Sequence, residues 1–226
     1  MTSELGGSTW PETARRGPTL LALPLGSTEQ HGPHLPLDTD TRIAVALAER
    51  LARHRSDVAV APALAYGASG EHQGFPGTLS LGTDALTTTL VELGRSADHF
   101  AGVVVVNGHG GNRDALERAT AVLTGEGRRV LAWAPSVPGG DAHAGRTETS
   151  LLLALDPAAV RADRAEPGAV APLPDLIGEL RGQGVAAVAP NGVLGDPSGA
   201  SADEGVALLD RLTADLVAAV ERAFDR

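Results

Sequence analysis

Short apolar runs alternate with amphipathic segments along this chain. The apolar runs, each of a length typical of a buried strand, cover residues 19–25, 58–62, 102–107 and 129–134. Segments with apolar residues at helical spacing lie between and after them, over residues 39–53, 84–99, 113–124, 146–155 and 202–224. The run at 102–107 contains four consecutive valines, which indicates a strand buried on both faces. This alternation predicts an α/β domain with a mostly parallel sheet and helices on both faces.

Three segments do not fit this alternation. Residues 1–18 are polar and rich in Gly, Ser and Arg, and we expect them to form a flexible tail before a single domain at residues 19–226. Residues 63–82 form a Gly-rich loop, and loops of this length are often functional. Residues 156–200 carry much of the chain's Pro and Gly, so we expect loop with short elements there.

Composition excludes several classes of function. With 226 residues, the chain can bury a substantial core in one domain. It has no Cys, which excludes disulfides, thiolate nucleophiles and Cys-type zinc sites. All 18 basic residues are Arg, so lysine chemistry is absent. A net charge of −10 argues against nucleic acid and anionic membranes as partners. We find no membrane-spanning run and no signal peptide, and therefore expect a cytoplasmic protein.

Residues 29–40 concentrate carboxylates and imidazoles. Glu29 and His31 are two positions apart, so on an extended segment they point to the same side, while Gln30 points away. Asp40 follows a turn stiffened by proline, and a carboxylate has two oxygens with which to bridge two metal ions. The pattern favours a metal or catalytic site. The alternative is a polar loop whose Asp begins the next helix.

His109 lies between glycines directly after the valine-rich strand. Glycines let the backbone turn sharply and leave space beside the imidazole, which favours a metal or catalytic role. A second interpretation is a phosphate-binding loop at a helix N-terminus, although residues 108–111 lack the full dinucleotide-binding motif. A third is an ordinary tight turn. Ligands of parallel α/β domains bind beyond the carboxyl ends of strands, where Glu29, His31 and His109 all fall.

Residues 141–150 form a third polar cluster. Glu148 falls in the first turn of a predicted helix, where a carboxylate is favoured by the helix dipole even without a function. His143 lies in a loop of small residues and is a candidate proton shuttle, since an imidazole titrates near neutral pH.

The remaining histidines divide into two kinds. His34 and His72 are candidates for lining a pocket, as is Tyr66 in the long Gly-rich loop. His54 and His99 lie at predicted helix ends, where we expect them to interact with the C-terminal dipole.

Three motifs in this order resemble the creatininase family of metal-dependent amidohydrolases. Residues 29–37 read EQHGPHLPL and are followed by Asp40, residues 107–112 read NGHGGN, and residues 143–150 begin with HAG and end with ETS. The resemblance covers about residues 19–224. It implies a three-layer α/β/α sandwich with a mostly parallel central sheet and a dinuclear metal centre, and, as in creatininase itself, a homo-oligomer that is a hexamer.

Matching positions carry the family's metal ligands onto this chain. Glu29, Asp40 and His109 resemble the ligands of one ion. His31 and Asp40 resemble ligands of the second, which makes Asp40 the bridging residue. The implied cofactors are two divalent metal ions per subunit, and oxygen and imidazole ligands suit Zn, Mn or Fe(II).

One position departs from creatininase. Creatininase has a glutamate ligand two residues after the motif histidine, whereas this chain has Gly111. The difference argues against creatinine as the substrate. Family members with the Gly-Gly form imply that Glu148 supplies the missing carboxylate, and His143 matches the family's proposed catalytic histidine.

Within the family, residues 35–41 and the short, Arg- and Ala-rich chain most resemble a member that matures a modified ribosomal precursor peptide. That member removes a crosslinked C-terminal Val-Tyr dipeptide. The resemblance implies metal-assisted amide hydrolysis, in which His143 donates a proton to the leaving nitrogen. Three alternatives remain open: a family amidohydrolase acting on a cyclic amide or formamide, a non-catalytic anion-binding module, and a scaffold subunit whose metal stabilises an oligomer.

Overall fold

A computed structural model describes residues 4–17 and 19–225. Its centre is a parallel sheet of four strands in the order β2-β1-β3-β4. The strands are β1 (Leu20–Leu25), β2 (Val58–Val60), β3 (Gly102–Asn107) and β4 (Val130–Trp133). The predicted strands are confirmed, with ends that differ by one or two residues.

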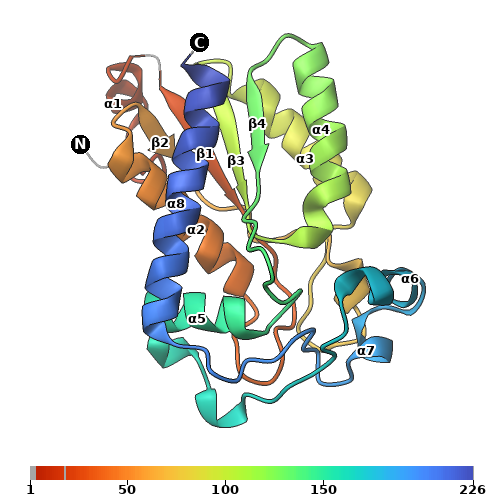
Figure 1. Ribbon diagram of the computed structural model, residues 1–226. Coiled ribbons are helices and arrows are strands. Elements are labelled where there is room, and N and C mark those ends of the chain that lie inside the picture. The colour runs from red at the N-terminus through yellow and green to blue at the C-terminus, as the bar shows by residue number, and fades with distance from the viewer. Residues whose placement is uncertain (1–3, 18, 226) are drawn as a thin grey trace.

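Helices cover both faces of the sheet (Figure 1). One face packs against α2 (Thr39–His54), α5 (Arg146–Leu155) and α8 (Ala202–Phe224). The opposite face packs against α3 (Thr83–Ser96) and α4 (Arg113–Gly125). The predicted α/β/α architecture is therefore confirmed.

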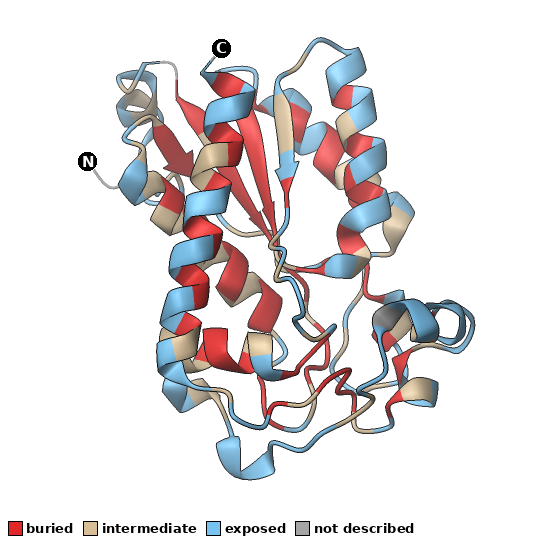
Figure 2. Ribbon diagram, in the orientation of Figure 1, coloured by how far each residue is buried: buried red, intermediate tan, exposed pale blue. Residues whose placement is uncertain are grey.

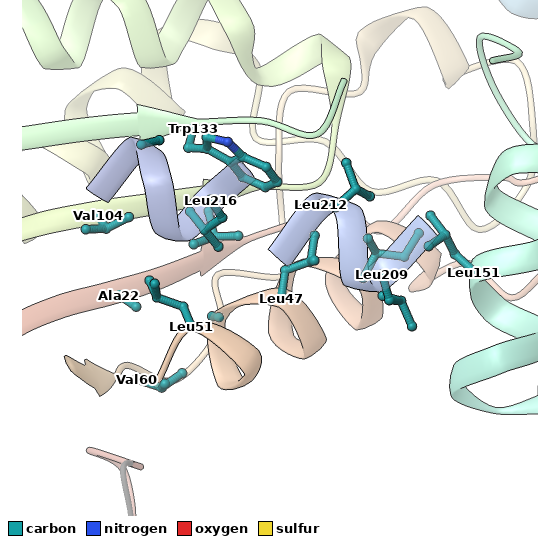
Figure 3. Packing of buried hydrophobic residues seen from close by; sticks show 14 of the residues in the cluster. Ala22, Leu47, Leu51, Val60, Val104, Trp133, Leu151, Leu209, Leu212 and Leu216 are labelled. Carbon is teal, nitrogen blue, oxygen red and sulfur yellow. The ribbon is translucent and has the colours of Figure 1, made fainter. Parts of the chain in front are cut away.

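Alternation along β1 and β3 explains the two hydrophobic layers. Ala22, Val104 and Val106 face α2 and α8, whereas Leu23 and Val105 face α3 and α4. Figure 3 shows the first layer, with leucines of α2 and α8 packed onto the sheet around Val104 and Trp133. Strands β1, β2 and β3 are almost entirely buried, whereas the edge strand β4 is partly exposed (Figure 2). The helices therefore shield the central strands from water on both faces.

The topology defines where a site can form. From β1 the chain runs to β2 on one side, and β3 then pairs on the other side of β1. A crevice beyond the carboxyl ends of β1 and β3 is the usual ligand site at such a switch point. The register pairs Leu25 with Asn107, so both strands end at the same level. Gly108 N–H also donates to the carbonyl of Leu25 at 2.8 Å, which keeps the two following loops together.

Residues 156–200 contain more helix than predicted. They include α6 (Leu173–Gln183), α7 (Val185–Val188) and two 3₁₀ turns, Pro157–Ala159 and Ala162–Arg164. The 11-residue α6 was missed because it contains one proline and two glycines and has a mostly exposed surface. Buried Leu180 and Val185 anchor α6 and α7 in a separate small hydrophobic cluster.

The N-terminal segment is partly ordered. It contains the short helix α1 (Trp10–Ala14), and Leu5 N–H donates to the carbonyl of Val60 at the edge of β2. The division into a flexible tail at residues 1–18 and a single domain at 19–226 stays a prediction, and residues 1–3, 18 and 226 lie outside the described residues. Among the helices that the structure describes, none is long and apolar enough to cross a membrane.

Candidate metal centre

Five separate segments deliver polar side chains to the carboxyl end of the sheet. Glu29 and His31 follow β1, and His109 follows β3. The other three come from α2 (Asp40), from α5 (Glu148) and from the loop before α5 (His143). All six residues predicted for the site therefore lie together. Asp40 and Glu148 occupy the first turns of their helices, where the helix dipole favours a negative charge.

Asp40 is the centre of the cluster. Its Oδ1 lies 3.1 Å from His31 Nε2, and its Oδ2 lies 3.3 Å from His109 Nδ1. Ser27 Oγ donates to the same Oδ2 at 2.8 Å and fixes the carboxylate. Each oxygen of Asp40 thus faces a different imidazole, which is the arrangement required of a carboxylate that bridges two cations.

The Glu29 carboxylate is completely buried and neither of its oxygens has a hydrogen-bond partner of good geometry. Oε2 lies 3.1 Å from His109 Nε2, and Oε1 lies 3.3 Å from His72 Nε2. A buried carboxylate without hydrogen bonds is costly unless a cation compensates it. Glu29 could therefore serve as a metal ligand.

Glu148 extends to the cluster from the first turn of α5. Its Oε2 lies 4.0 Å from His31 Nε2 and accepts a hydrogen bond of 2.6 Å from the backbone N–H of Ala144. Ala144 has a φ of 52°, a left-handed conformation that costs energy for a residue with a side chain. This strained turn aims the Ala144 N–H at the carboxylate and so fixes the position of Glu148.

These side chains form three groups whose potential ligand atoms lie within 4.8 Å of one another. The first is Glu29, Asp40 and His109, and the second is His31, Asp40 and Glu148, so the two groups share Asp40. The third is Glu29, His31 and His143. All three consist of the oxygen and imidazole donors that suit divalent transition metals.

The tautomer of His31 supports the fit to a metal. His31 Nδ1 donates to the backbone carbonyl of Glu29 at 3.1 Å, which leaves a lone pair on Nε2. That nitrogen faces Asp40 and Glu148, so either a proton or a metal ion must lie between the ring and these carboxylates. Donation from the other ring nitrogen to a carbonyl is the usual second contact of a metal-bound histidine.

The shifted pKa values of three side chains in the cluster also fit a metal site. Burial alone would lower the pKa of His31, but the carboxylate of Asp40 raises it to about 10. Burial would also lower the pKa of His109, but Glu29 and Asp40 hold it well above its usual value. Burial raises the pKa of Glu148 to about 7. His31 and His109 thus keep their protons at neutral pH, and a divalent ion would replace those protons.

A cavity of about 830 Å³ opens beside the cluster, a volume typical of small-molecule sites. Asp40, His109, His143 and Glu148 line it, so substrate has access to the predicted site. The far wall is formed by α6 and α7, which Figure 1 shows beyond the carboxyl end of the sheet.

The structure also places the remaining candidates. His72 contacts Glu29 and lines the cavity, whereas His34 is buried against Thr149 with a contact of 2.8 Å to its hydroxyl. Tyr66 is 47% exposed and is not among the residues that line the cavity. Both His54 and His99 are exposed near helix ends.

Sequence reasoning missed two residues that lie beside the proposed ligands. Gln30 was expected to point away, but its amide contacts His72 and His143. Glu71 lines the cavity with Oε1 3.6 Å from His109 Nε2, and a Cβ at Gly111 would lie 2.4 Å from that oxygen. The Gly-rich loop at residues 63–82 was the only sequence signal for Glu71.

Gly108 provides a test of how the loops pack. A Cβ at Gly108 would lie 2.4 Å from the backbone oxygen of Asp40, and neither atom belongs to a flexible side chain. We expect Gly108→Ala to lower the free energy of unfolding by about 1–3 kcal/mol, as overpacking does. Denaturant unfolding measures the change. Gly110→Ala is the matched control, because a Cβ there meets nothing within 4 Å. Equal stability of the two variants would contradict the close approach.

Comparisons with known proteins identify a family and similar chains. The family model named Creatininase and described as creatinine amidohydrolase matches residues 7–220. The mycofactocin precursor peptide peptidase of Mycobacterium tuberculosis (strain H37Rv) is 53% identical over 230 residues, covering 97% of this chain and 91% of that protein. The creatinine amidohydrolase of Pseudomonas putida is 34% identical over 194 residues, covering 71% and 74%.

Solved structures give the same match. A manganese form of creatininase superposes with a TM-score of 0.84 at 28% identity and covers 100% of both chains. A zinc-zinc form of a creatininase variant superposes with a TM-score of 0.83 at 28% identity, again over 100% of both chains.

Proposed function

Because this chain belongs to the creatininase family, we propose that it is the metal-dependent peptidase that matures a mycofactocin precursor peptide. It is a hydrolase of carbon–nitrogen bonds, as its family relatives are. The proposal of this particular peptidase activity rests on one observation. The chain is 50–53% identical to four mycofactocin precursor peptide peptidases over at least 95% of its length.

We propose that two divalent ions, Zn, Mn or Fe(II), occupy the groups that share Asp40. Glu29, Asp40 and His109 would hold one ion, and His31, Asp40 and Glu148 the other. When bound, such ions lower the pKa of water toward neutrality and polarise a carbonyl oxygen. The orphaned oxygens of Glu29 and the lone pair on His31 support this assignment.

His143 and Glu148 are the proposed catalytic residues. Amide hydrolysis adds water to the carbonyl carbon, breaks the C–N bond and requires a proton on the leaving nitrogen. Burial and the neighbouring His31 hold the pKa of His143 well below its usual value, so its imidazole is neutral. A neutral imidazole accepts the proton that the attacking water loses and returns it to the leaving nitrogen. Glu148, on the cavity wall, orients the water by accepting its second hydrogen bond.

The proposed substrate is a modified ribosomal precursor peptide, from which the enzyme removes the crosslinked C-terminal Val-Tyr dipeptide. The size of the cavity, about 830 Å³, supports a substrate larger than a single small ring. The far wall supplies apolar contacts from Ile177, Leu180 and Val185, which suit valine and tyrosine side chains. Gly111, which replaces a carboxylate of creatininase, supports a substrate other than creatinine.

We also propose that the protein is a cytoplasmic homo-oligomer, with the hexamer of creatininase as the expected form. Three large apolar side chains, Tyr66, Leu79 and Leu81, are 40–54% exposed on one region of the surface. The backbone of Leu81 is hydrogen-bonded to Gly67, which keeps the two segments together. Exposed apolar side chains that cluster in this way are typical of protein interfaces and support assembly.

A mass-spectrometric assay tests the substrate. Metal-loaded protein is incubated in parallel with the crosslinked precursor peptide, with creatinine and with a formamide. We expect the peptide to lose its C-terminal dipeptide, and turnover of either small amide to be at least ~100-fold slower, the discrimination that a pocket built for other contacts gives. Hydrolysis of a small amide with an intact peptide would instead favour the small-molecule amidohydrolase.

A further inference from the structure

The side-chain amide of Gln30 is oriented by two backbone groups. Its Oε1 accepts a hydrogen bond of 2.8 Å from the N–H of Gly32, which can only donate. Its Nε2 donates at 3.0 Å to the carbonyl of Gly192, which can only accept. The amide therefore has one orientation, and Nε2 has one N–H left for another acceptor. Gln30 is buried, so water does not compete for that hydrogen.

The remaining N–H of Gln30 determines the tautomer of His72. Gln30 Nε2 lies 2.9 Å from His72 Nδ1, which must be the unprotonated nitrogen because it accepts this hydrogen bond. The proton of the neutral ring is then on Nε2. That nitrogen lies 3.3 Å from Glu29 Oε1, so His72 directs an N–H toward the proposed ligand.

The backbone of Gln30 determines the tautomer of His143. His143 Nε2 donates to the carbonyl of Gln30 at 2.8 Å, which leaves the lone pair on Nδ1. Nδ1 lies 3.8 Å from the same Glu29 oxygen and faces the cluster. The contact of 3.1 Å between Gln30 Nε2 and His143 Nε2 joins two nitrogens whose hydrogens are used elsewhere, so it is a packing contact.

Packing holds the three imidazoles in this arrangement. The ring centroid of His143 lies 4.5 Å from that of His72 and 4.4 Å from that of His31. A rotation of His72 would therefore displace His143 and disturb the proposed ligand His31. All three rings are buried, and their mutual contacts restrict the rotation of each ring.

We propose that Gln30 is a positioning residue that directs the Nε2–H of His72 toward Glu29 and keeps Nδ1 of His143 free for proton transfer. The inference rests on the metal centre proposed above. Residues that contact the metal ligands without binding the metal orient those ligands. Their loss reduces metal affinity by about 10–100-fold. The same network explains why a glutamine lies between two proposed metal ligands, although its side chain belongs to neither of the two groups that share Asp40.

Gln30→Glu is the test variant. Glutamate is isosteric and still accepts from Gly32, but it cannot donate to His72 Nδ1. The proton of His72 should then move to Nδ1, and Nε2 should lose its N–H toward Glu29. We expect the affinity for Zn²⁺, measured by chelator competition, to fall about 10–100-fold. NMR of Zn-loaded protein with ¹⁵N-labelled histidine should show His72 change from the Nε2–H to the Nδ1–H tautomer.

Two further variants separate hydrogen bonding from general damage to the fold. His72→Gln retains an N–H donor close to the position of Nε2 and should keep Zn²⁺ affinity within a fewfold of wild type. His72→Leu should lose as much affinity as Gln30→Glu. Gln73→Glu, at an exposed position of the same loop, is the charge control and should leave the Zn²⁺ affinity unchanged.

The measured Zn²⁺ affinities and the tautomer of His72 either support or overturn the positioning role of Gln30. Unchanged Zn²⁺ affinity and an unchanged His72 tautomer in Gln30→Glu would overturn it. If Gln30→Glu does not fold, equal losses in His72→Gln and His72→Leu would also overturn it, because the donor would then have no specific effect. Zn²⁺ affinity does not depend on the substrate. Failure to cleave the precursor peptide would therefore reject the proposed function and leave this test intact.

Discussion

Asp40→Ala is expected to remove both metal ions and nearly all peptide cleavage. The two proposed metal groups share this single carboxylate, and each of its oxygens faces one of the two ligand histidines. Its loss therefore disrupts both groups at once. We expect kcat/KM to fall by more than ~10³-fold, since removal of even one group that stabilises the transition state costs about 10²–10³. Elemental analysis of the purified variant measures the metal, and mass spectrometry of the peptide measures cleavage.

Two variants make the Asp40 result specific. Asp40→Asn keeps the volume and the hydrogen bond from Ser27, so an equal loss there would assign the effect to the charge. Asp38→Asn, two residues away, changes a half-exposed carboxylate that is paired with Arg42 and should remain near wild type. An Asp40→Ala protein that retains two ions per subunit would disprove the bridging role.

Glu148→Gln should have the second largest effect. Gln retains an oxygen that can accept the N–H of Ala144, so the turn before α5 should be preserved. The variant loses the negative charge near His31, and we expect one of the two ions to dissociate. Loss of a proton-handling or water-orienting carboxylate should lower kcat by about 10²–10⁴-fold. Metal content and single-turnover cleavage provide the two readouts.

Glu71→Gln is the matched control for Glu148. Glu71 also lines the cavity, but it lies outside the three proposed ligand groups, so we expect a change of less than ~10-fold. Two ions and a normal rate in Glu148→Gln would contradict the assignment of that residue. A loss in Glu71→Gln as large as that in Glu148→Gln would mean that the required carboxylate is Glu71.

The position of the site could be predicted because parallel strands end together. The valine-rich strand indicated a parallel sheet, and residues after β1 and β3 necessarily emerge at the same edge. Helix starts then supplied Asp40 and Glu148. Local patterns were sufficient to place these residues, but only the resemblance to the creatininase family predicted Glu148 as a ligand.

The contacts that hold the proposed ligands in place, such as that between Gln30 and His72, could not be predicted from local patterns. The segment after β1 is not a regular strand, since Thr28 forms an isolated bridge with Leu79 and His31 forms one with Leu35. The rule that side chains alternate therefore failed for Gln30. Its partner His72 is 42 residues distant in the chain, and that contact depends on the tertiary packing of the Gly-rich loop. Helix α6 was missed for a related reason, because tertiary packing through Leu180 overrides its Pro and Gly content.

A metal titration of the peptidase reaction tests the central claim most directly. Protein stripped of metal would receive increasing Zn²⁺ or Mn²⁺, with release of the C-terminal dipeptide from the precursor peptide followed by mass spectrometry. We predict no cleavage without metal and a rate that rises to a plateau at two ions per subunit. Full cleavage by the metal-free protein, or no cleavage with both ions bound, would contradict the account.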